Sequence, residues 1–240
     1  MNLIIDTGNT CTKIAVFDNN KIVFNLRIDI LTISVIQDII SRFNIDKCII
    51  SSTKEFDDNY KKAIDTIDGT VIYFNHKTNV PIKNLYHSPE TLGMDRLASV
   101  IGAHNKYPES DILVIDMGTA ITYDFINSKG EYLGGNISPG INMRLKALNH
   151  FTSRLPIINK DGALPDLGYD TETAIRSGVV NGVKHEITGF INSLNVKYPN
   201  LFVFLTGGDT LYFDSSIKNR IFVEDFLVLE GLNNVLEYVN

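Results

Sequence analysis

Apolar residues along the first part of the chain form short runs that are typical of strands alternating with helices. Ile- and Val-rich runs bounded by turn residues predict strands, and apolar residues at every fourth position from Leu31 to Phe43 predict a helix. Asn19-Asn20 predicts a tight hairpin turn. The expected elements are, in order, strands over 2–6, 13–18 and 21–28, a helix over 31–43, a strand over 47–52, a helix over 56–67 and a strand over 70–74. A hairpin-led sheet followed by alternating helices and strands indicates an α/β fold.

The second part of the chain repeats this order of elements. The expected elements are strands over 112–116, 121–126 and 131–137, a helix over 171–194 that Asp170 caps, a strand over 201–206 and a helix from about 225. The two parts also match residue by residue when Asp116 is set against Asp6. Leu3, Ile5, Asp6, Gly8 and Thr12 then meet Leu113, Ile115, Asp116, Gly118 and Thr122.

This repetition predicts a duplicated α/β fold with domains 1–108 and 109–240, each opening with a strand–acid–Gly–Thr hairpin. We expect the two turns to face each other across a cleft, which is a natural place for a phosphate-bearing ligand. One such hairpin alone would be interpreted as a plain hairpin with a small residue in its turn. The paired occurrence favours a functional role for both turns.

Composition limits the expected partners and location. The hydrophobic fraction of 44% is ample for a sizeable core. The net charge of −6 argues against a general nucleic-acid or anionic-membrane surface, although a helix N-terminus binds an anion locally. We find no signal peptide and no apolar run of bilayer length, and Cys11 and Cys48 lack metal-type spacing. We therefore expect a cytoplasmic protein that binds neither nucleic acid nor membrane.

The first turn has residue types that suit a phosphate group. Gly8 and Asn9 tolerate backbone conformations that other residues resist, and Gly8 permits close approach of an anion to the N–H groups of 8–10. Thr10 offers a hydroxyl and Lys13 a positive charge. Asp6 would repel phosphate, so its expected role is to hold a hydrated Mg²⁺. The matching aspartate of the second part, Asp116, is a candidate ligand for a second cation.

Two further stretches carry candidate chemistry. GMDR (93–96) is expected in the first turns of a helix, where Asp95 could accept a proton from a hydroxyl and Arg96 could grip a carboxylate or phosphate. An ordinary solvated charge pair is the simpler interpretation. TGGD (206–209) could let a flat base lie against the backbone, or could be a plain strand-to-helix turn capped by Asp209.

With these residues in hand, the sequence resembles type III pantothenate kinases over its whole length. The motifs are DTGNTCTK (6–13), YHSPETLGMDR (86–96), DMGTAIT (116–122), GGNISPG (134–140), TETAIRSGVVNG (171–182) and TGGD (206–209). The first of these alone would indicate only the superfamily of acetate and sugar kinases, actin and heat-shock chaperones. The resemblance therefore implies two ribonuclease H-like (actin-like) domains with mixed five-stranded sheets and flanking helices.

The resemblance also implies an activity and its residues. The activity is ATP-dependent phosphorylation of pantothenate to 4′-phosphopantothenate, the first step of coenzyme A biosynthesis, by a homodimer whose pantothenate pocket lies at the subunit interface. It implies that ATP binds Asp6, Thr7, Gly8, Asn9, Thr10, Cys11, Thr12, Lys13 and Thr119. It implies that pantothenate is held by Tyr86, Gly93, Met94, Asp95, Arg96 and Thr171, with Asp95 as the catalytic proton acceptor. Asp116 is implied as the ligand of a monovalent cation, K⁺ or NH₄⁺, needed beside Mg²⁺.

Three other functions fit the same scaffold. A sugar kinase would differ in its acceptor substrate, and an actin-like filament protein would need more chain for extra subdomains. A nucleotide-binding regulator without catalysis would gain nothing from Asp6, Asp95 and Asp116. Fold alone does not decide among these functions.

Overall fold

The computed structural model describes residues 1–53, 58–212 and 220–239. Contacts divide the chain into two compact units. The first unit consists of Met1–Glu109, Ile126–Gly134 and Phe226–Asn240, and the second of Ser110–Phe125 and Gly135–Asp225. The chain therefore crosses between the units four times, returning to the first unit at 126–134 and again for its last helix.

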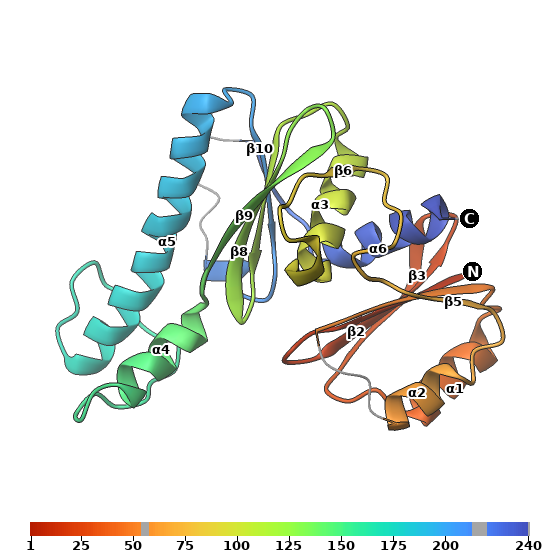
Figure 1. Ribbon diagram of the computed structural model, residues 1–240. Coiled ribbons are helices and arrows are strands. Elements are labelled where there is room, and N and C mark those ends of the chain that lie inside the picture. The colour runs from red at the N-terminus through yellow and green to blue at the C-terminus, as the bar shows by residue number, and fades with distance from the viewer. Residues whose placement is uncertain (54–57, 213–219, 240) are drawn as a thin grey trace. The chain divides into compact units, whose positions relative to one another are not determined.

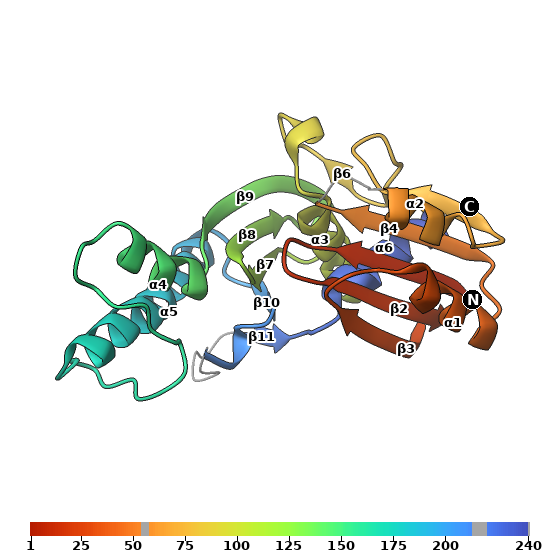
Figure 2. The ribbon, with the colours of Figure 1, turned by 90° about the horizontal axis from the view of Figure 1, so that it is seen from below.

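The first unit is built on a five-stranded sheet with β1 at its centre (Figures 1 and 2). The strands are β1 (Asn2–Thr7), β2 (Thr12–Asp18), β3 (Lys21–Ile28), β4 (Lys47–Ser52) and β5 (Thr70–Tyr73), in the order β3-β2-β1-β4-β5. β1 is antiparallel to β2 and parallel to β4. Asn19 and Asn20 have φ values of 47° and 63°, so the predicted hairpin turn between β2 and β3 is confirmed.

Helices cover both faces of this sheet. α1 (Ile33–Arg42) and α2 (Asp58–Ile64) lie on the face to which Leu3 and Ile5 contribute, and their buried residues join one core. α3 (Met94–Lys106) and α6 (Leu227–Tyr238) lie on the other face (Figure 1). On that side the Asn2 side chain donates a hydrogen bond of 2.8 Å to Asn233 of α6.

Two glycines allow α3 and α6 to pack backbone against backbone. A Cβ on Gly231 would overlap the carbonyl oxygen of Ala98, and a Cβ on Gly102 would overlap that of Leu227. Backbones approach this closely only where both helices present residues without side chains. This contact holds the C-terminal helix in the first unit, although the sequence-based boundary groups 109–240 together. The division into domains 1–108 and 109–240, inferred from the sequence repeat, remains a prediction.

A second sheet has six strands in the order β11-β10-β7-β8-β9-β6. They are β6 (Lys83–Asn84), β7 (Ile112–Met117), β8 (Ala120–Ile126), β9 (Glu131–Pro139), β10 (Phe202–Thr206) and β11 (Arg220–Val223). In the second unit, α4 (Ile141–His150) and α5 (Thr171–Lys197) lie side by side (Figure 1). The residues of α5 that face the sheet, among them Val183 and Ile187, join Leu113 and Ile115 in its core.

Most predicted elements are present within a few residues of their expected bounds. The part of the predicted helix 56–67 before residue 58 lies outside the described residues. α4, β6, β11 and the short 3₁₀ helices Pro89–Thr91 and Thr210–Tyr212 were not predicted, and the second sheet has six strands where five were expected. The α/β class is confirmed. The predicted N-cap is also confirmed, because the Asp170 carboxylate accepts the Thr173 N–H at 2.8 Å.

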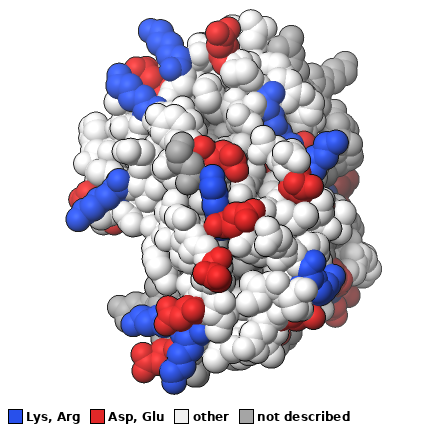
Figure 3. All heavy atoms as spheres, turned by 90° about the vertical axis from the view of Figure 1, so that its right-hand side faces the viewer, with Lys and Arg blue, Asp and Glu red and all other residues white. Residues whose placement is uncertain are grey.

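Charges on the face drawn in Figure 3 are of both signs and interspersed. That face has no concentrated basic patch among the described residues drawn there. In the part of the chain that the structure describes, no helix has the length and apolar character needed to span a bilayer.

We predict that Gly231→Ala lowers the free energy of unfolding by about 1–3 kcal/mol, because the added methyl overpacks the contact between α3 and α6. Urea unfolding followed by circular dichroism measures this. Gly189→Ala is the matched control, since it lies in a helix with open space around its Cβ, and it should stabilise by up to about 1 kcal/mol. Equal effects of the two substitutions would contradict the packing argument.

Candidate active site

The strand register sets Asp6 beside a cation at the end of β1. Asp6 lies opposite Lys13 of β2 and beside Ser51 of β4, and residues paired in this way point to the same face of a sheet. Asp6 and Ser51 are buried, with 7% and 1% of their surfaces exposed. Alternation along β1 sets this face toward α3 and α6 rather than toward α1 and α2. A buried carboxylate, an amino group and a hydroxyl therefore share one end of the first sheet.

The next pair in the register points to the opposite face. The hydroxyls of Thr7 and Thr12 are 3.2 Å apart, and Thr7 is 3.1 Å from the hydroxyl of Tyr60 in α2. Burial raises the pKa of Tyr60, so this phenol stays neutral at ordinary pH. Thr7 and Thr12 therefore brace the hairpin from the helical side.

The turn between β1 and β2 differs from its expected conformation. Gly8 has no left-handed φ, and neither has Asn9. The Gly8 N–H donates a hydrogen bond of 3.0 Å to the carbonyl of Cys11, and a Cβ on Gly8 would make only ordinary contacts. Gly8 is therefore required neither by its φ nor by internal packing. Asn9 and Thr10 are exposed, and Cys11 is a half-buried free thiol.

Asp95 lies at the second residue of α3 and folds back over the start of the helix. Its Oδ1 accepts the Arg96 N–H at 2.8 Å, and a Cβ on Gly93 would lie 2.6 Å from the same oxygen. Gly93 therefore leaves the space that this carboxylate occupies. Asp95 is half-buried and Arg96 is buried, so the interpretation as a solvated charge pair does not hold. Met94 is half-buried at the first residue of the helix.

Tyr86 joins this group through its ring. The Arg96 guanidinium carbon lies 5.7 Å from the centre of the Tyr86 ring, within the range of a cation–π contact. The Tyr86 ring stacks on Tyr132 with centroids 6.1 Å apart, and Gly134 lies against it with φ of 116°. The structure thus brings together Tyr86, Gly93, Asp95 and Arg96, four of the six residues implied to hold pantothenate. Tyr132 and Gly134 were missed, although the glycine pair of GGNISPG was a signal.

Asp116 lies at the end of β7 beside two glycine turns of the second unit. Gly207 has φ of 98°, and a Cβ there would lie 2.5 Å from Asp116 Oδ1 and 2.6 Å from the Met117 carbonyl oxygen. The two oxygens therefore converge on the space that the glycine leaves. Thr119 is exposed in the turn between β7 and β8, and its carbonyl accepts the Gly140 N–H at 3.1 Å.

Asp209 and Thr171 also lie in the second unit. The Asp209 N–H donates to the Met117 carbonyl at 3.1 Å, while its carboxylate forms an ion pair with Lys160. TGGD leads from β10 into the 3₁₀ helix Thr210–Tyr212, so Asp209 directly precedes a short helix. Thr171 is the exposed first residue of α5. The unit that contains Thr171 is not the one that contains Tyr86 and Asp95.

Cation binding at these turns would rest on few protein ligands. Among the described residues, no group of three or more His, Cys, Asp or Glu side chains is arranged to hold a metal ion. One carboxylate with one carbonyl, as at Asp116 and Met117, suits a weakly held cation that prefers oxygen ligands. This donor set is too small for a closed structural metal site.

Solved structures share the fold of the chain. A protein described as a Baf family transcriptional activator from Campylobacter jejuni has a TM-score of 0.63 at 22% identity, covering 98% of each chain. MreB5 of Spiroplasma citri bound to ADP has a TM-score of 0.53 at 12% identity, covering 99% of this chain and 96% of that one. The Lmo2764 protein of Listeria monocytogenes, described as an N-acetylmannosamine kinase, has a TM-score of 0.56 at 12% identity, covering 100% of this chain and 99% of that one. The predicted actin-like fold class is confirmed.

Curated relatives are similar over their full length. The type III pantothenate kinase of Bacteroides fragilis is 47% identical over 240 residues, which are 100% of this chain and 99% of the relative. That of Porphyromonas gingivalis is 40% identical, with 99% and 98% covered. The family model described as type III pantothenate kinase matches residues 2–193. With the GMDR carboxylate, the two aspartate turns and this match in agreement, the chain belongs to the type III pantothenate kinase family.

Proposed function

We propose that this kinase phosphorylates pantothenate to 4′-phosphopantothenate with ATP, at the start of coenzyme A biosynthesis. The family supports the reaction, since the match covers most of the chain. The observation that carries the mechanism is the Asp95 carboxylate, which the Arg96 N–H and Gly93 hold at the start of α3. A carboxylate fixed in this way is ready to accept a proton.

Asp95 acts as the general base in this proposal. A primary hydroxyl is a weak nucleophile at neutral pH, and it becomes stronger as its proton is removed. Oδ1 of Asp95 is engaged by the Arg96 N–H, so we assign proton acceptance to Oδ2. The proton leaves the hydroxyl as the oxygen bonds to the γ-phosphorus, and ADP carries away the electron pair of the broken bond.

Arg96 and Tyr86 orient the acceptor substrate. Pantothenate carries a carboxylate, and a guanidinium binds a carboxylate through two parallel hydrogen bonds. Arg96 is buried and stacked on the Tyr86 ring, so it keeps one geometry instead of sampling many rotamers. Gly93, Met94 and Thr171 complete our assignment of pantothenate contacts.

The turns bind the nucleotide. We assign the ATP phosphates to residues 6–13 and Thr119, with the Lys13 ammonium as the countercharge, and the base to Gly207-Gly208. Asp6 would hold Mg²⁺ through water, which supplies further charge neutralisation when the metal is bound. Asp116 would hold K⁺ or NH₄⁺ at the end of β7, with the Met117 carbonyl as a second oxygen nearby.

The second unit has an apolar face that suits a second copy of the chain. A groove of about 540 Å³ runs between α4 and α5, and Arg144 is the charged residue among those lining it. Large exposed apolar side chains lie along the same stretch, namely Met143, Phe151, Ile157, Leu167 and Tyr169. Exposed apolar side chains gathered in this way support the proposal of an interaction surface. Thr171 lies at the start of α5 beside it, which agrees with a pantothenate pocket completed by a homodimer.

A cytoplasmic location, without nucleic-acid or membrane partners, remains part of the proposal. Cys11 and Cys48 are both free thiols, as expected in a reducing compartment.

We predict that Asp95→Asn lowers kcat by about 100-fold or more, the usual scale of general-base catalysis, while ATP still binds. Asparagine keeps an oxygen for the Arg96 N–H but cannot take the proton. A coupled assay of ADP release with pantothenate measures kcat, and calorimetry measures ATP binding. Asp38→Asn, in an exposed ion pair of α1, is the control and should leave both unchanged. Near-normal turnover of Asp95→Asn would show that Asp95 is not the general base. Activity with a sugar acceptor but not with pantothenate would contradict the proposed substrate.

We predict that activity in K⁺ or NH₄⁺ buffer largely disappears in Na⁺ buffer, and that Asp116→Asn reduces activity in every buffer. The reason is that the carboxylate supplies the charge of the cation site. Initial rates at equal ionic strength test this. Equal activity in K⁺ and Na⁺ would contradict the monovalent-cation role of Asp116.

We predict that Phe151→Asp converts a dimer into a monomer, because it sets a charge on the apolar face beside the groove. Light scattering during size-exclusion chromatography measures the mass. Val196→Asp, equally exposed near the end of α5, is the matched control and should stay dimeric. A wild-type monomer, or loss of the dimer in both variants, would contradict this interface.

A further inference from the structure

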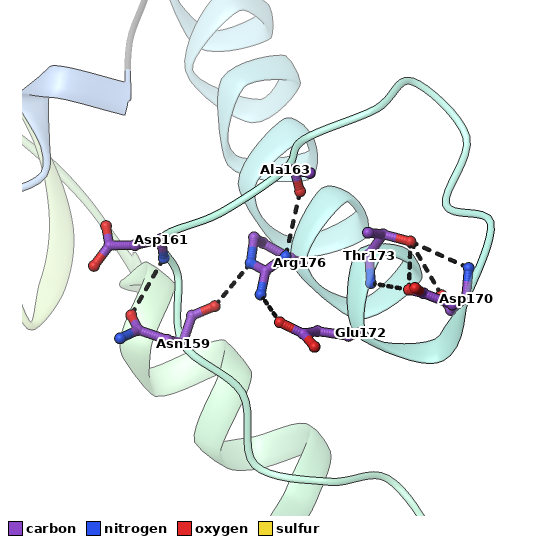
Figure 4. Close-up of polar contacts among 7 residues, drawn as sticks. All are labelled: Asn159, Asp161, Ala163, Asp170, Glu172, Thr173 and Arg176. Atoms are coloured by element: carbon purple, nitrogen blue, oxygen red, sulfur yellow. Dashed lines mark hydrogen bonds and ion pairs between the residues drawn. The ribbon is translucent and has the colours of Figure 1, made fainter.

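The segment between α4 and α5 is held in place by a buried arginine of α5. Arg176 is 4% exposed, and its guanidinium donates to the carbonyl oxygens of Asn159 at 3.0 Å and Ala163 at 3.4 Å (Figure 4). It also forms an ion pair with Glu172, whose side chain is 62% exposed. Gly162 has φ of 134°, and a Cβ there would lie 2.8 Å from the guanidinium carbon. The segment 159–163 is therefore wrapped closely around one cation.

The same segment contacts the turn after β10. Lys160 forms an ion pair with Asp209, whose side chain is 9% exposed, and its ammonium lies 5.2 Å from the centre of the Tyr212 ring. The Tyr212 hydroxyl donates a hydrogen bond to Asp161, which raises the pKa of Tyr212 to about 12. Lys160 and Asp161 thus contact Asp209 of the turn and Tyr212 of the following 3₁₀ helix.

On its other side this turn touches the Asp116 strand. The Asp209 N–H donates to the Met117 carbonyl, and Gly207 lies against Asp116 Oδ1. The 207–209 turn is therefore held between the end of β7 and the segment 159–163. All of these residues belong to the second unit.

The ion pair of Lys160 with Asp209 differs from an ordinary surface ion pair. A long lysine side chain costs entropy to fix, and an exposed ion pair would contribute little. Here the partner is a buried carboxylate, so loss of the ammonium would leave Asp209 uncompensated. The turn would then rearrange to bring Asp209 to water.

We propose that Arg176 and Lys160 are positioning residues for the nucleotide: Arg176 fixes the segment 159–163, and Lys160 through Asp209 fixes the 207–209 turn. This inference rests on the proposed function, in which Gly207-Gly208 receives the base of ATP. Neither residue touches the acceptor substrate in that assignment. Their removal therefore weakens nucleotide binding and leaves pantothenate binding in place.

The test uses the full chain with Lys160→Met, which keeps length and removes charge, and Lys160→Arg, which restores the charge. Lys160→Met should raise the KM for ATP and the Kd for ADP by roughly tenfold or more, the scale of breaking a largely buried ion pair. The KM for pantothenate should change by less than about twofold, since neither Lys160 nor Asp209 is among the assigned pantothenate contacts. Hydrogen exchange of the peptide 206–212 should become faster. Lys160→Arg should restore most of the nucleotide affinity and most of the protection from exchange.

Variants of Arg176 and Glu172, which hold the segment 159–163, provide a second test. Arg176→Lys should also speed exchange in 206–212, because an ammonium cannot reach both carbonyl oxygens and the carboxylate. Glu172→Gln is the matched control, since it removes only the exposed ion pair and should behave as wild type. If Arg176→Lys does not fold, the comparison of Lys160→Met with Lys160→Arg still tests whether the charge of Lys160 positions the 207–209 turn.

The outcomes separate this inference from the proposed function. A wild type that binds ADP but does not phosphorylate pantothenate overturns the proposed function. The ADP affinity and the hydrogen exchange of 206–212 then still test whether Lys160 and Arg176 position the 207–209 turn. Unchanged exchange and ADP affinity in Lys160→Met overturn the inference. An equal rise of both KM values overturns it too, since that would indicate a general structural role.

Discussion

The site depends on carboxylates that occupy the space in which a glycine lacks a side chain. The pairs are Gly93 with Asp95 and Gly207 with Asp116, and the missing Cβ would lie 2.6 and 2.5 Å from an Oδ1 atom. An acid held against backbone in this way loses rotamer freedom before any ligand arrives. An alanine at either of these glycines would displace the carboxylate, so the motifs fix geometry as much as chemistry.

The duplication explains why two of the candidate acids have the same relation to their own sheets. In the first unit Leu3 and Ile5 face the core under α1 and α2, and Asp6 points to the other face. In the second unit Leu113 and Ile115 face α5, and Asp116 falls in the opposite phase of its strand. A period of two fixes this outcome once one face is apolar. Each unit thus ends its central apolar strand with an acid directed away from its own helical core.

Local signals in the sequence predicted what local physics determines. The cap at Asp170 and the start of α3 at GMDR follow from capping and periodicity, and the structure confirms both. The two-residue strand β6, the stacking of Tyr86 on Tyr132 and the packing of α6 on α3 depend on contacts between distant residues. No local pattern encodes those contacts. The conformational freedom expected of Gly8 and Asn9 is not used, because this hairpin closes without a left-handed residue at either position.

Charge explains how an acidic chain could handle two anionic substrates. A net charge of −6 repels anions at long range, so attraction must come from single cations at short range. Lys13 faces Asp6, and the Arg96 guanidinium lies over the Tyr86 ring. Each cation is thus held by an acid or a ring, which limits its reach and fixes its direction. A substrate then gains from these charges only in the pose that meets them, so the arrangement favours orientation over general attraction to anions.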